Sequence, residues 1–454
     1  MNSRDGFNSK LGIIAAAAGS AIGLGNIWKF PYMAGQFGGG AFILIYILAI
    51  ILMGYPLIYC EFALGRKAKS NAVDTYGIVT QNKKWNIIGY IGVGTVFLIT
   101  TFYMMITGWV IYYLWHSITG NLYTVPESVQ ATEYFAQFFT QMNSSMWAPL
   151  IFALIAICLT GWVNAKGIGE GVEKYSKIMM PILFIIFIIL IVYSMTLDGF
   201  KEAFNFLFKP DLSAITPTVI ISAIGQAFFS LSIGMGALVT YGSYISEKED
   251  LRQLATQVSI ADTIIALFAG LLIFPAVFTY NLEPTAGPSL IFISLPEVFL
   301  KMPGGRIFSI LFFVLIIVAA ITSMISMLEI MVTFVDERTK LSRKSVTWLI
   351  VFVVSIGGMI NIAGEGPLSF IKFSGKTIFE CLDYFTNNIT IPLVAVLTAV
   401  VATWIWKIPN LNKELTLGGR NATKSDHFFN LLLKWVIPPT IIILMVALLL
   451  GVQA

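Results

Sequence analysis

Two apolar stretches of the sequence are interrupted by glycine in the same way. Residues 19–26 read Gly-Ser-Ala-Ile-Gly-Leu-Gly-Asn, and residues 230–236 read Ser-Leu-Ser-Ile-Gly-Met-Gly. Glycine weakens a helix by about 1 kcal/mol per residue relative to alanine, so both stretches should unwind locally. Within a membrane, an unwound helix offers carbonyl oxygens to a cation and a positively polarised N-terminus to a carboxylate. The pair predicts a site for a zwitterionic amino acid carried with sodium, and close packing of helices through small residues is the alternative.

Several polar side chains lie within apolar stretches, where burying them is costly and usually functional. Asp262 lies in the middle of Ser-Ile-Ala-Asp-Thr-Ile-Ile (259–265), with no lysine or arginine nearby in the sequence. A cation bound beside Asp262 would offset the cost of removing its charge from water. For Glu61 and Glu329, an ordinary hydrogen bond between helices is an equally good interpretation. The whole set is Asn26, Glu61, Ser230, Asp262, Thr322, Ser323, Glu329 and Asp383.

The elements that position these residues must cross a membrane. Of the 454 residues, 57% are hydrophobic and 11% are charged, whereas soluble domains are about 45–50% apolar and about 25% charged. A net charge of +4, spread over short loops, argues against a nucleic-acid partner. The two histidines and three cysteines form no metal or disulfide pattern. No nucleophile–base pair appears either, so we expect an integral membrane protein that is not an enzyme.

Runs of about 20 apolar residues are needed to cross a bilayer as helices, and the sequence contains eleven. With the N-terminus placed in the cytoplasm, 21 of the 28 Lys and Arg residues fall in internal segments and six in external ones. This asymmetry predicts a cytoplasmic N-terminus and an external C-terminus. The spans are expected at about 11–36, 39–65, 86–116, 147–164, 174–196, 216–243, 255–281, 304–336, 345–362, 378–406 and 431–452.

The matching interruptions in the first and sixth spans indicate two inverted repeats. We expect one transporter domain over 1–454, with repeats at about 11–196 and 216–406 and one extra helix at about 431–452. The predicted fold class is therefore an all-α integral membrane protein of eleven transmembrane helices. Five plus five of them form the inverted repeats, and helices 1 and 6 are unwound.

At these residues the chain resembles the neurotransmitter:sodium symporter family, and within it the bacterial amino-acid transporters. The resemblance rests on the first-span motif Gly-Ser-Ala-Ile-Gly-Leu-Gly-Asn-Ile-Trp-Lys-Phe-Pro (19–31) and on Gly-Gly-Gly-Ala-Phe (38–42). It extends to the Glu61–Arg66 end of the second span and to Gly-Gln-Ala-Phe-Phe-Ser-Leu-Ser (225–232). The family typically has twelve spans, and in having eleven this chain resembles a subset of the bacterial members.

The resemblance implies two sodium sites with hard oxygen ligands, which suit an alkali cation. The first would use the Ala21 carbonyl and the side chains of Asn26, Ser230 and Asp262, together with the substrate's carboxylate. The second would use the carbonyls of Gly19, Ile22 and Ala319 and the hydroxyls of Thr322 and Ser323. Sodium and substrate would be coupled because the substrate itself is an ion ligand.

The resemblance also implies how an amino acid is held. Its carboxylate would meet backbone N–H groups near Leu24 and Gly25, the Tyr103 hydroxyl and sodium. Its ammonium would meet carbonyls of Ser20, Phe229 and Ser230, with Ser232 and Ala21 close by. The wall around its side chain would include Ile99, Tyr103, Phe229, Met235, Met324 and Met327. Flexible methionines favour a large, flat side chain, and ordinary core packing is their alternative interpretation. The resemblance is closest to bacterial carriers of tyrosine and of other hydrophobic amino acids, so it implies a hydrophobic or aromatic L-amino acid, tyrosine first.

Two departures from the family pattern carry expectations of their own. Many members have asparagine where this chain has Asp262, and eukaryotic members bind chloride beside that position. Tyr46, Gln226 and Ser230 match the chloride site, but Ala266 stands where a serine or glutamate is usual. An ionised Asp262 would supply the missing negative charge, so we expect chloride-independent transport, with a proton on Asp262 during the empty return step. The second departure is Lys29, where arginine is usual at the outer gate.

The resemblance places a gate on each face of the site. Tyr103 and Phe229 would form an outer lid, with Lys29 and Asp383 paired above it. On the inner face Arg4 and Phe7 precede the first span, and Arg4 would pair with Asp336 or Glu337. Tyr244 and Glu329 would complete this inner layer. For Arg4 and Asp336, ordinary interfacial charges remain the alternative.

A glycine and a proline ten residues apart, Gly171 and Pro181, match a family site of partial helix unwinding that lets water reach the second sodium. We expect a multi-pass protein of a bacterial inner membrane that binds sodium and an amino acid and no nucleic acid. The monomer is the expected functional unit, and a homodimer is the alternative. Among other classes, an ion channel, an amino-acid sensor that does not transport, and a related five-plus-five-helix carrier of another small solute fit the sequence less well.

Overall fold

The structure, a computed structural model, describes residues 6–280, 290–417 and 424–449, and the regular elements within these ranges are helices. Nine helices in this part of the chain are long and apolar enough to cross a membrane. The protein is therefore a helical membrane protein with several passes. The nine run over Gly40–Ala68, Lys83–Thr119, Trp147–Asn164, Ile168–Ser194, Leu251–Thr279, Gly305–Asp336, Arg343–Glu365, Ile378–Ile405 and Asp426–Leu448.

Most of these spans are built from one or two α-helices joined end to end. The principal helices are α3 (Gly40–Ala49), α4 (Tyr55–Ala68), α6 (Asn86–Thr119), α8 (Trp147–Asn164), α9 (Lys174–Ser194), α13 (Leu251–Thr279), α15 (Gly305–Asp336), α16 (Arg343–Glu365), α17 (Ile378–Phe385), α18 (Ile391–Val400), α20 (Lys424–Leu431) and α21 (Ile437–Leu449). Shorter helices lie in the connections: α5 (Asp74–Thr80), α7 (Ala131–Ser144), α10 (Phe200–Phe208), α14 (Leu295–Lys301) and α19 (Ile408–Thr416).

The two glycine-rich stretches break their helices, as the sequence predicts. In the first, α1 (Lys10–Ala21) is followed by the segment Gly25–Gln36, which contains α2 (Phe30–Gln36), and the two halves are bent by 47°. In the other, α11 (Pro217–Ser230) ends before a non-helical turn and α12 (Ala237–Gly242) follows it. Counting the bent pair gives ten spans. The predicted count of eleven requires α11 and α12, each too short to cross alone, to form one broken span.

Prolines explain several irregular turns inside the spans. A proline ring clashes with the carbonyl four residues earlier in an α-helix and lacks the N–H of that turn. The wider π-helical turn relieves this conflict while most backbone groups stay paired, which the lipid environment demands. Five such turns lie directly before an α-helix that begins X-Pro: Gly25–Lys29, Ile50–Gly54, Leu290–Ser294, Thr386–Thr390 and Leu432–Val436.

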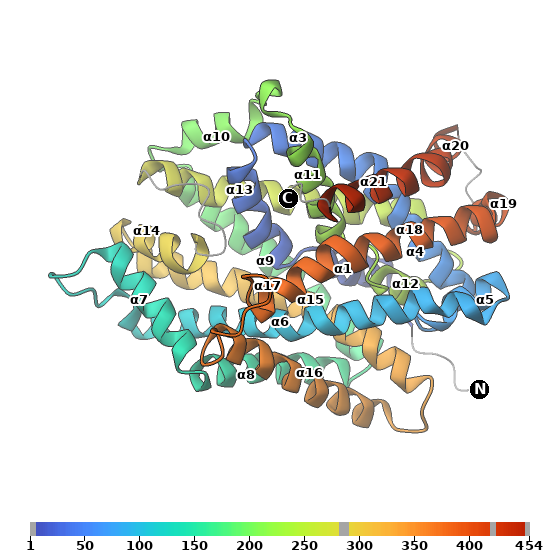
Figure 1. Cartoon of the computed structure of the whole chain (residues 1–454), viewed down its shortest axis with the longest axis horizontal. Coiled ribbons are helices and arrows are strands. Elements are labelled where there is room, and N and C mark those ends of the chain that lie inside the picture. Colours follow the sequence, from blue (N-terminus) through green and yellow to red (C-terminus); the bar gives the residue numbers. More distant parts are fainter. Residues whose placement is uncertain (1–5, 281–289, 418–423, 450–454) are drawn as a thin grey trace.

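The helices lie roughly side by side (Figure 1), with α6 packed along α8, α15 and α16, and α1 against α9, α13 and α15. The helices α5, α19 and α20 gather at one end of the bundle, at the right of the view, and α7, α10 and α14 at the other. The short helix α12, which follows the second break, packs closely against α4. A Cβ on Gly65 would lie only 1.9 Å from the Val239 carbonyl oxygen. Only glycine allows this approach.

The fifth span begins earlier than the predicted 174–196. It starts with a π-helical turn over Ile168–Glu173, after Gly167 at φ +92°. Gly171 lies in this turn, and Pro181 lies inside the continuous α9. The segment is helical throughout in this conformation, so the predicted unwinding between Gly171 and Pro181 stays a prediction.

Candidate functional site

The two helix breaks lie against each other. The Ser232 hydroxyl donates to the Ser20 carbonyl at 2.9 Å, and the Gln226 amide donates to the Gly25 carbonyl at 2.7 Å. The turn between α11 and α12 has positive φ at Ser232, Gly234 and Gly236. The Gly234 N–H donates to the buried Glu61 carboxylate at 2.8 Å. This bond fixes the broken backbone to α4. It gives Glu61 a role that the sequence alone had left open.

A first polar cluster surrounds Asp262 on α13. The carboxylate accepts hydrogen bonds from Asn26 and Ser230, each at 2.7 Å, and from the Tyr46 hydroxyl at 2.9 Å. Asp262 is fully buried, and no ion pair within the described residues involves it. The cluster therefore joins an ionisable carboxyl group to neutral partners only. Ala266, one turn further along α13, is also buried.

A second polar cluster joins α15 to the end of α1. The Ser323 hydroxyl lies 3.3 Å from the Gly19 carbonyl oxygen and 3.4 Å from that of Ile22. The Thr322 hydroxyl donates to the Ala319 carbonyl at 2.9 Å. The structure thus brings all five residues predicted for the second sodium site together. Three carbonyls and two hydroxyls form an uncharged set of hard oxygen atoms, which suits a monovalent cation.

Tyr103 on α6 connects the first helix break to this second cluster. Its hydroxyl accepts the Leu24 N–H at 2.9 Å. A Cβ on Gly23 would lie 2.6 Å from the Tyr103 hydroxyl and 2.4 Å from that of Ser323, so this glycine leaves the space that the two hydroxyls fill. Four further predicted wall residues are all buried: Ile99, Met324 and Met327 on the flanking helices, and Met235 in the second break.

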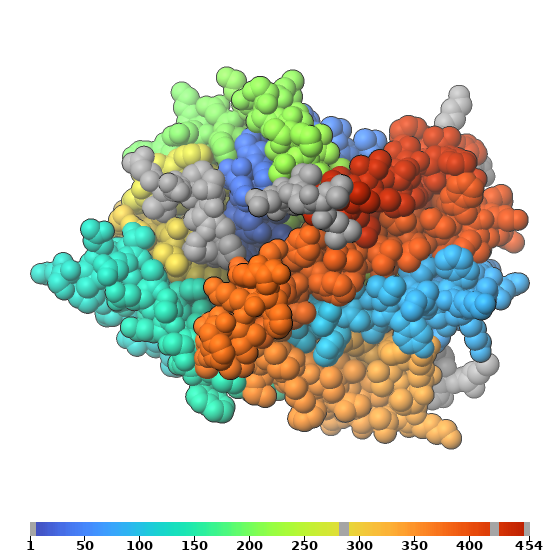
Figure 2. All heavy atoms as spheres, in the orientation of Figure 1, coloured from blue at the N-terminus to red at the C-terminus, as the bar shows by residue number. Residues whose placement is uncertain are grey.

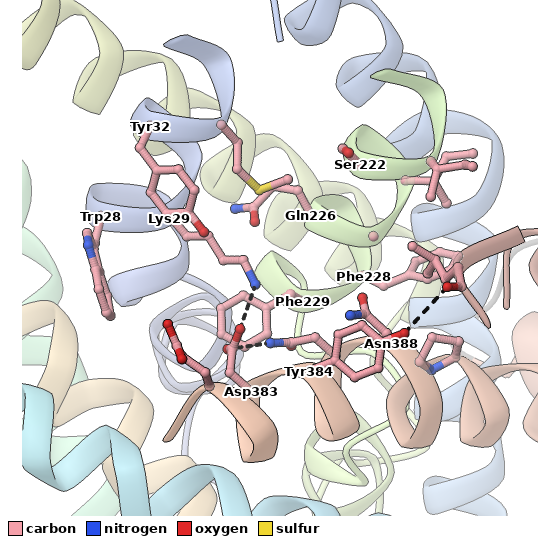
Figure 3. A pocket seen from close by; sticks show the side chains of 18 of the residues that line it. Trp28, Lys29, Tyr32, Ser222, Gln226, Phe228, Phe229, Asp383, Tyr384 and Asn388 are labelled. Carbon is pink, nitrogen blue, oxygen red and sulfur yellow. Dashed lines mark hydrogen bonds and ion pairs between the residues drawn. The ribbon is translucent and has the colours of Figure 1, made fainter. Parts of the chain in front are cut away.

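A cavity of about 350 Å³ leads to this region. Leu24, Tyr103 and Phe229 line it together with Lys29 and Asp383. The Lys29 ammonium lies 3.8 Å from the Asp383 carboxylate and 4.9 Å from the centre of the Phe229 ring. Figure 3 shows the lysine reaching from its helix toward Asp383 on α17. The predicted outer gate residues therefore meet, and we call this end of the molecule the cavity end.

The opposite end is closed by a layer of aromatic and ionic contacts. The Phe7 ring packs edge-on against Tyr241 and Tyr244, with centroids 5.7 and 6.2 Å apart. Tyr244 donates to the buried Glu329 carboxylate at 3.2 Å, and Arg343 forms an ion pair with the same carboxylate. The predicted pair of Tyr244 and Glu329 thus meets. Arg343 was not predicted from the sequence, because this residue begins a span, where a charge is ordinary. The available signal was its position only 14 residues after the intramembrane Glu329.

The choice between Asp336 and Glu337 as the partner of Arg4 stays open, because Arg4 lies outside the described residues. Glu337 accepts the backbone N–H of Asn71 at 2.9 Å and the Ser70 hydroxyl at 3.2 Å. It therefore joins the end of α15 to the connection between α4 and α5. Asp336 is the last residue of α15.

The fold and the site together define a class: a membrane transporter with two broken helices and clusters of buried oxygen atoms at their junction. The model of the sodium:neurotransmitter symporter family matches residues 4–128 and 122–454. The chain belongs to this family, and is a sodium-dependent membrane transporter rather than an enzyme.

Two bacterial proteins illustrate the relationship. The chain is 39% identical over 436 residues to the uncharacterized sodium-dependent transporter YhdH of Bacillus subtilis, covering 96% of this chain and 95% of that protein. It is 35% identical over 453 residues to an uncharacterized sodium-dependent transporter of Haemophilus influenzae, covering 98% of each. The crystal structure of MhsT in complex with L-phenylalanine superposes with a TM-score of 0.90 at 38% identity, covering 98% of this chain and all of that one.

Proposed function

We propose that the protein is a chloride-independent symporter that couples sodium to the import of a hydrophobic or aromatic L-amino acid. The observation that carries this proposal is the buried Asp262 carboxylate, whose three donors are neutral. A buried charge without a counter-ion is strongly disfavoured. Sodium at this point, held by Asn26, Ser230, the Ala21 carbonyl and Asp262, supplies the positive charge.

The second sodium binds among Gly19, Ile22, Ala319, Thr322 and Ser323. In support, the Ser323 hydroxyl already lies within 3.4 Å of two of the three carbonyl oxygens. A cation at this place would tie α15 to the end of α1 across the helix break. Binding of sodium would therefore fix the geometry of the break before the substrate arrives.

The substrate carboxylate lies at the Leu24–Gly25 backbone and the Tyr103 hydroxyl, and its ammonium at the carbonyls around Ser20 and Phe229. The phenylalanine complex of MhsT supports a hydrophobic aromatic side chain as the cargo. The methionines at 235, 324 and 327 form an adaptable wall for a large ring. We propose tyrosine as the first candidate within this class.

Chloride independence follows from the same carboxylate. Asp262 contacts Tyr46 and Ser230, two positions that the family's chloride site would use. A second anion in contact with it would be repelled. In the return step without sodium, a proton on Asp262 would replace the positive charge of the ion.

Transport then proceeds by alternating access around the fixed site. The cavity leads to Tyr103 and Phe229 from one side, while Phe7, Tyr244 and Glu329 close the other. The charge asymmetry of the loops makes the closed end cytoplasmic, as expected in a bacterial inner membrane. The monomer contains the whole site and is the functional unit, with two five-helix inverted repeats and one extra helix.

Uptake of radiolabelled tyrosine and phenylalanine into proteoliposomes tests the proposal. An imposed sodium gradient without chloride should drive accumulation, and replacing sodium by potassium should abolish it. If neither is taken up, sodium-dependent binding is measured in competition with a panel of twenty amino acids. Binding of another amino acid would correct the substrate, binding without any uptake would indicate a sensor, and absence of binding would indicate a symporter for another small solute.

A further inference from the structure

The connection between α16 and α17 forms a tight hairpin at the cavity end. Phe373 and Lys376 exchange two backbone hydrogen bonds of 2.9 and 3.0 Å. The two residues between them, Ser374 and Gly375, have φ of +52° and +82°. Positive φ at both central positions is the geometry of a type I′ turn, which holds a hairpin rigidly. We refer to residues 366–377 as the hairpin.

The hairpin turns large aromatic side chains outward. Phe370 is 76% exposed and Phe373 is 60% exposed. In water each ring would leave most of its apolar area exposed, at a cost of roughly 25 cal/mol per Å². Two such rings on one short hairpin therefore favour an apolar cover.

A stripe of exposed apolar side chains on α16 precedes the hairpin in the chain. Phe352, Ile356 and Ile360 follow one another at intervals of one helical turn and are 63%, 43% and 52% exposed. Because the protein spans a membrane several times, this stripe faces acyl chains. Because the hairpin follows α16 directly in the chain, the lipid beside this stripe is the apolar phase nearest along the chain to the two phenylalanines.

The position of the hairpin along the bundle fits the membrane interface. A Cβ on Gly366 would lie 2.2 Å from the Asn143 carbonyl oxygen, so the start of the hairpin lies against the last turn of α7. Trp147, the first residue of α8, is 68% exposed at the same place. Exposed tryptophans mark the level of the headgroups. In Figure 2 the orange hairpin stands on the outside of this face, beside the teal atoms of α7 and α8.

We propose that the hairpin docks into the bilayer interface at the cavity end, with Phe370 and Phe373 at the boundary between headgroups and acyl chains. Lys372, exposed between them, reaches the lipid phosphates. A second copy of the chain could also cover the two phenylalanines, and the labelling experiment distinguishes it from lipid.

The hairpin is joined firmly to the wall of the cavity. The Thr377 N–H donates to the Glu380 carboxylate at 2.8 Å, and the Glu380 N–H donates to the Thr377 hydroxyl at 3.3 Å, which caps α17. The same helix carries Asp383 of the outer gate, and Lys376 lines the cavity above the Tyr384 ring at 4.0 Å. The lipid contact therefore holds the gate helix at a fixed depth.

Nitroxide labelling of the full-length protein in liposomes tests this inference. Cys60 is buried and stays in place, while Cys158→Ala and Cys381→Ser remove the accessible thiols. Single cysteines are then introduced as Phe370→Cys and Phe373→Cys, with Gln137→Cys on the exposed face of α7 as the aqueous control. Ile185→Cys, 57% exposed on α9, is the lipid control. Collision of each label with oxygen, which concentrates in lipid, and with a water-soluble nickel chelate is measured.

We expect the hairpin labels to collide mainly with oxygen, with values between those of the two controls. Collision with the nickel chelate equal to that of the Gln137→Cys label would overturn the proposal. Exclusion of both reagents, together with spin–spin broadening that disappears on dilution with unlabelled protein, would show a second copy in place of lipid and would overturn it as well. Because transport is not measured, the result does not depend on the proposed substrate.

Discussion

Replacing Asp262 by asparagine tests the electrostatic basis of sodium binding. The substitution keeps the shape of the side chain and removes its charge. In the wild type, three hydrogen bonds of 2.7, 2.7 and 2.9 Å hold the carboxylate in place. Its orientation is thus fixed by neutral neighbours. If sodium binds here as proposed, the main loss on substitution is the attraction between the carboxylate and the cation.

The size of this loss follows from Coulomb's law. Two unit charges about 4 Å apart at an effective dielectric constant of about 20 attract each other by about 4 kcal/mol. This energy corresponds to a factor of about 10³ in a dissociation constant. Relaxation of the amide, whose oxygen would still ligate the proposed sodium, returns part of this energy. We therefore expect the sodium concentration for half-maximal amino-acid binding to rise by about 10²–10³.

Scintillation proximity binding of labelled amino acid, titrated with sodium with and without chloride, measures this shift. Chloride should improve binding by Asp262→Asn and leave the wild type unchanged. Asp211→Asn, in an exposed connection, is the matched control that removes one charge far from the site. A shift of less than tenfold, or an equal response of both proteins to chloride, would refute the reasoning, provided that the variant elutes as a single folded species.

Three further predictions concern stability, each measured by thermal unfolding in detergent. Arg66→Ala leaves a carboxylate of α19 buried without its partner, so we expect a loss of about 3–5 kcal/mol; an unchanged Tm would contradict this. Gly234→Ala places a Cβ at φ +74° and 2.4 Å from a carbonyl oxygen of α18, which costs more than the roughly 1–2 kcal/mol of the left-handed conformation. The control Gly225→Ala lies inside α11 with open space around it, so it should raise stability by up to about 1 kcal/mol. Burial raises the pKa of Asp74, but hydrogen bonds, chiefly from Arg338, outweigh burial and hold this pKa below its ordinary value. The stabilisation by this pair is present above about pH 4 and disappears as the pH falls through the lowered pKa. The difference in Tm between wild type and Asp74→Asn should therefore narrow below about pH 4. A difference that stays constant with pH would show that the charge of Asp74 is not involved.

The sequence was most informative where a polar residue interrupts an apolar run. Asp262 and Ser323 stood out for this reason, and the structure places each in a polar cluster. The glycine pattern located both helix breaks, because the loss of helix propensity is local and needs no tertiary information. The predicted pairing of Lys29 with Asp383 came from the family resemblance, and no local pattern in the sequence joins these two residues.

Contacts between distant charges could not be read in the same way. Arg66 and Glu414 are 348 positions apart, and both lie near span ends, where charges are ordinary. The π-helical turns were also missed, since one additional residue in a uniformly apolar run leaves no visible pattern. Only the prolines that follow five of these turns hint at them.

One of these turns determines which way the second span faces. The π-helical turn Ile50–Gly54 holds one more residue than an α-helical turn would, and successive residues in a helix are rotated by about 100°. Without the additional residue, Glu61 would point about 100° away from the Gly234 N–H that it now binds. A single-residue gap between two relatives inside this span is therefore meaningful in an alignment. It records a change in the rotational phase of half a helix, and closing it by hand would pair residues that face different neighbours.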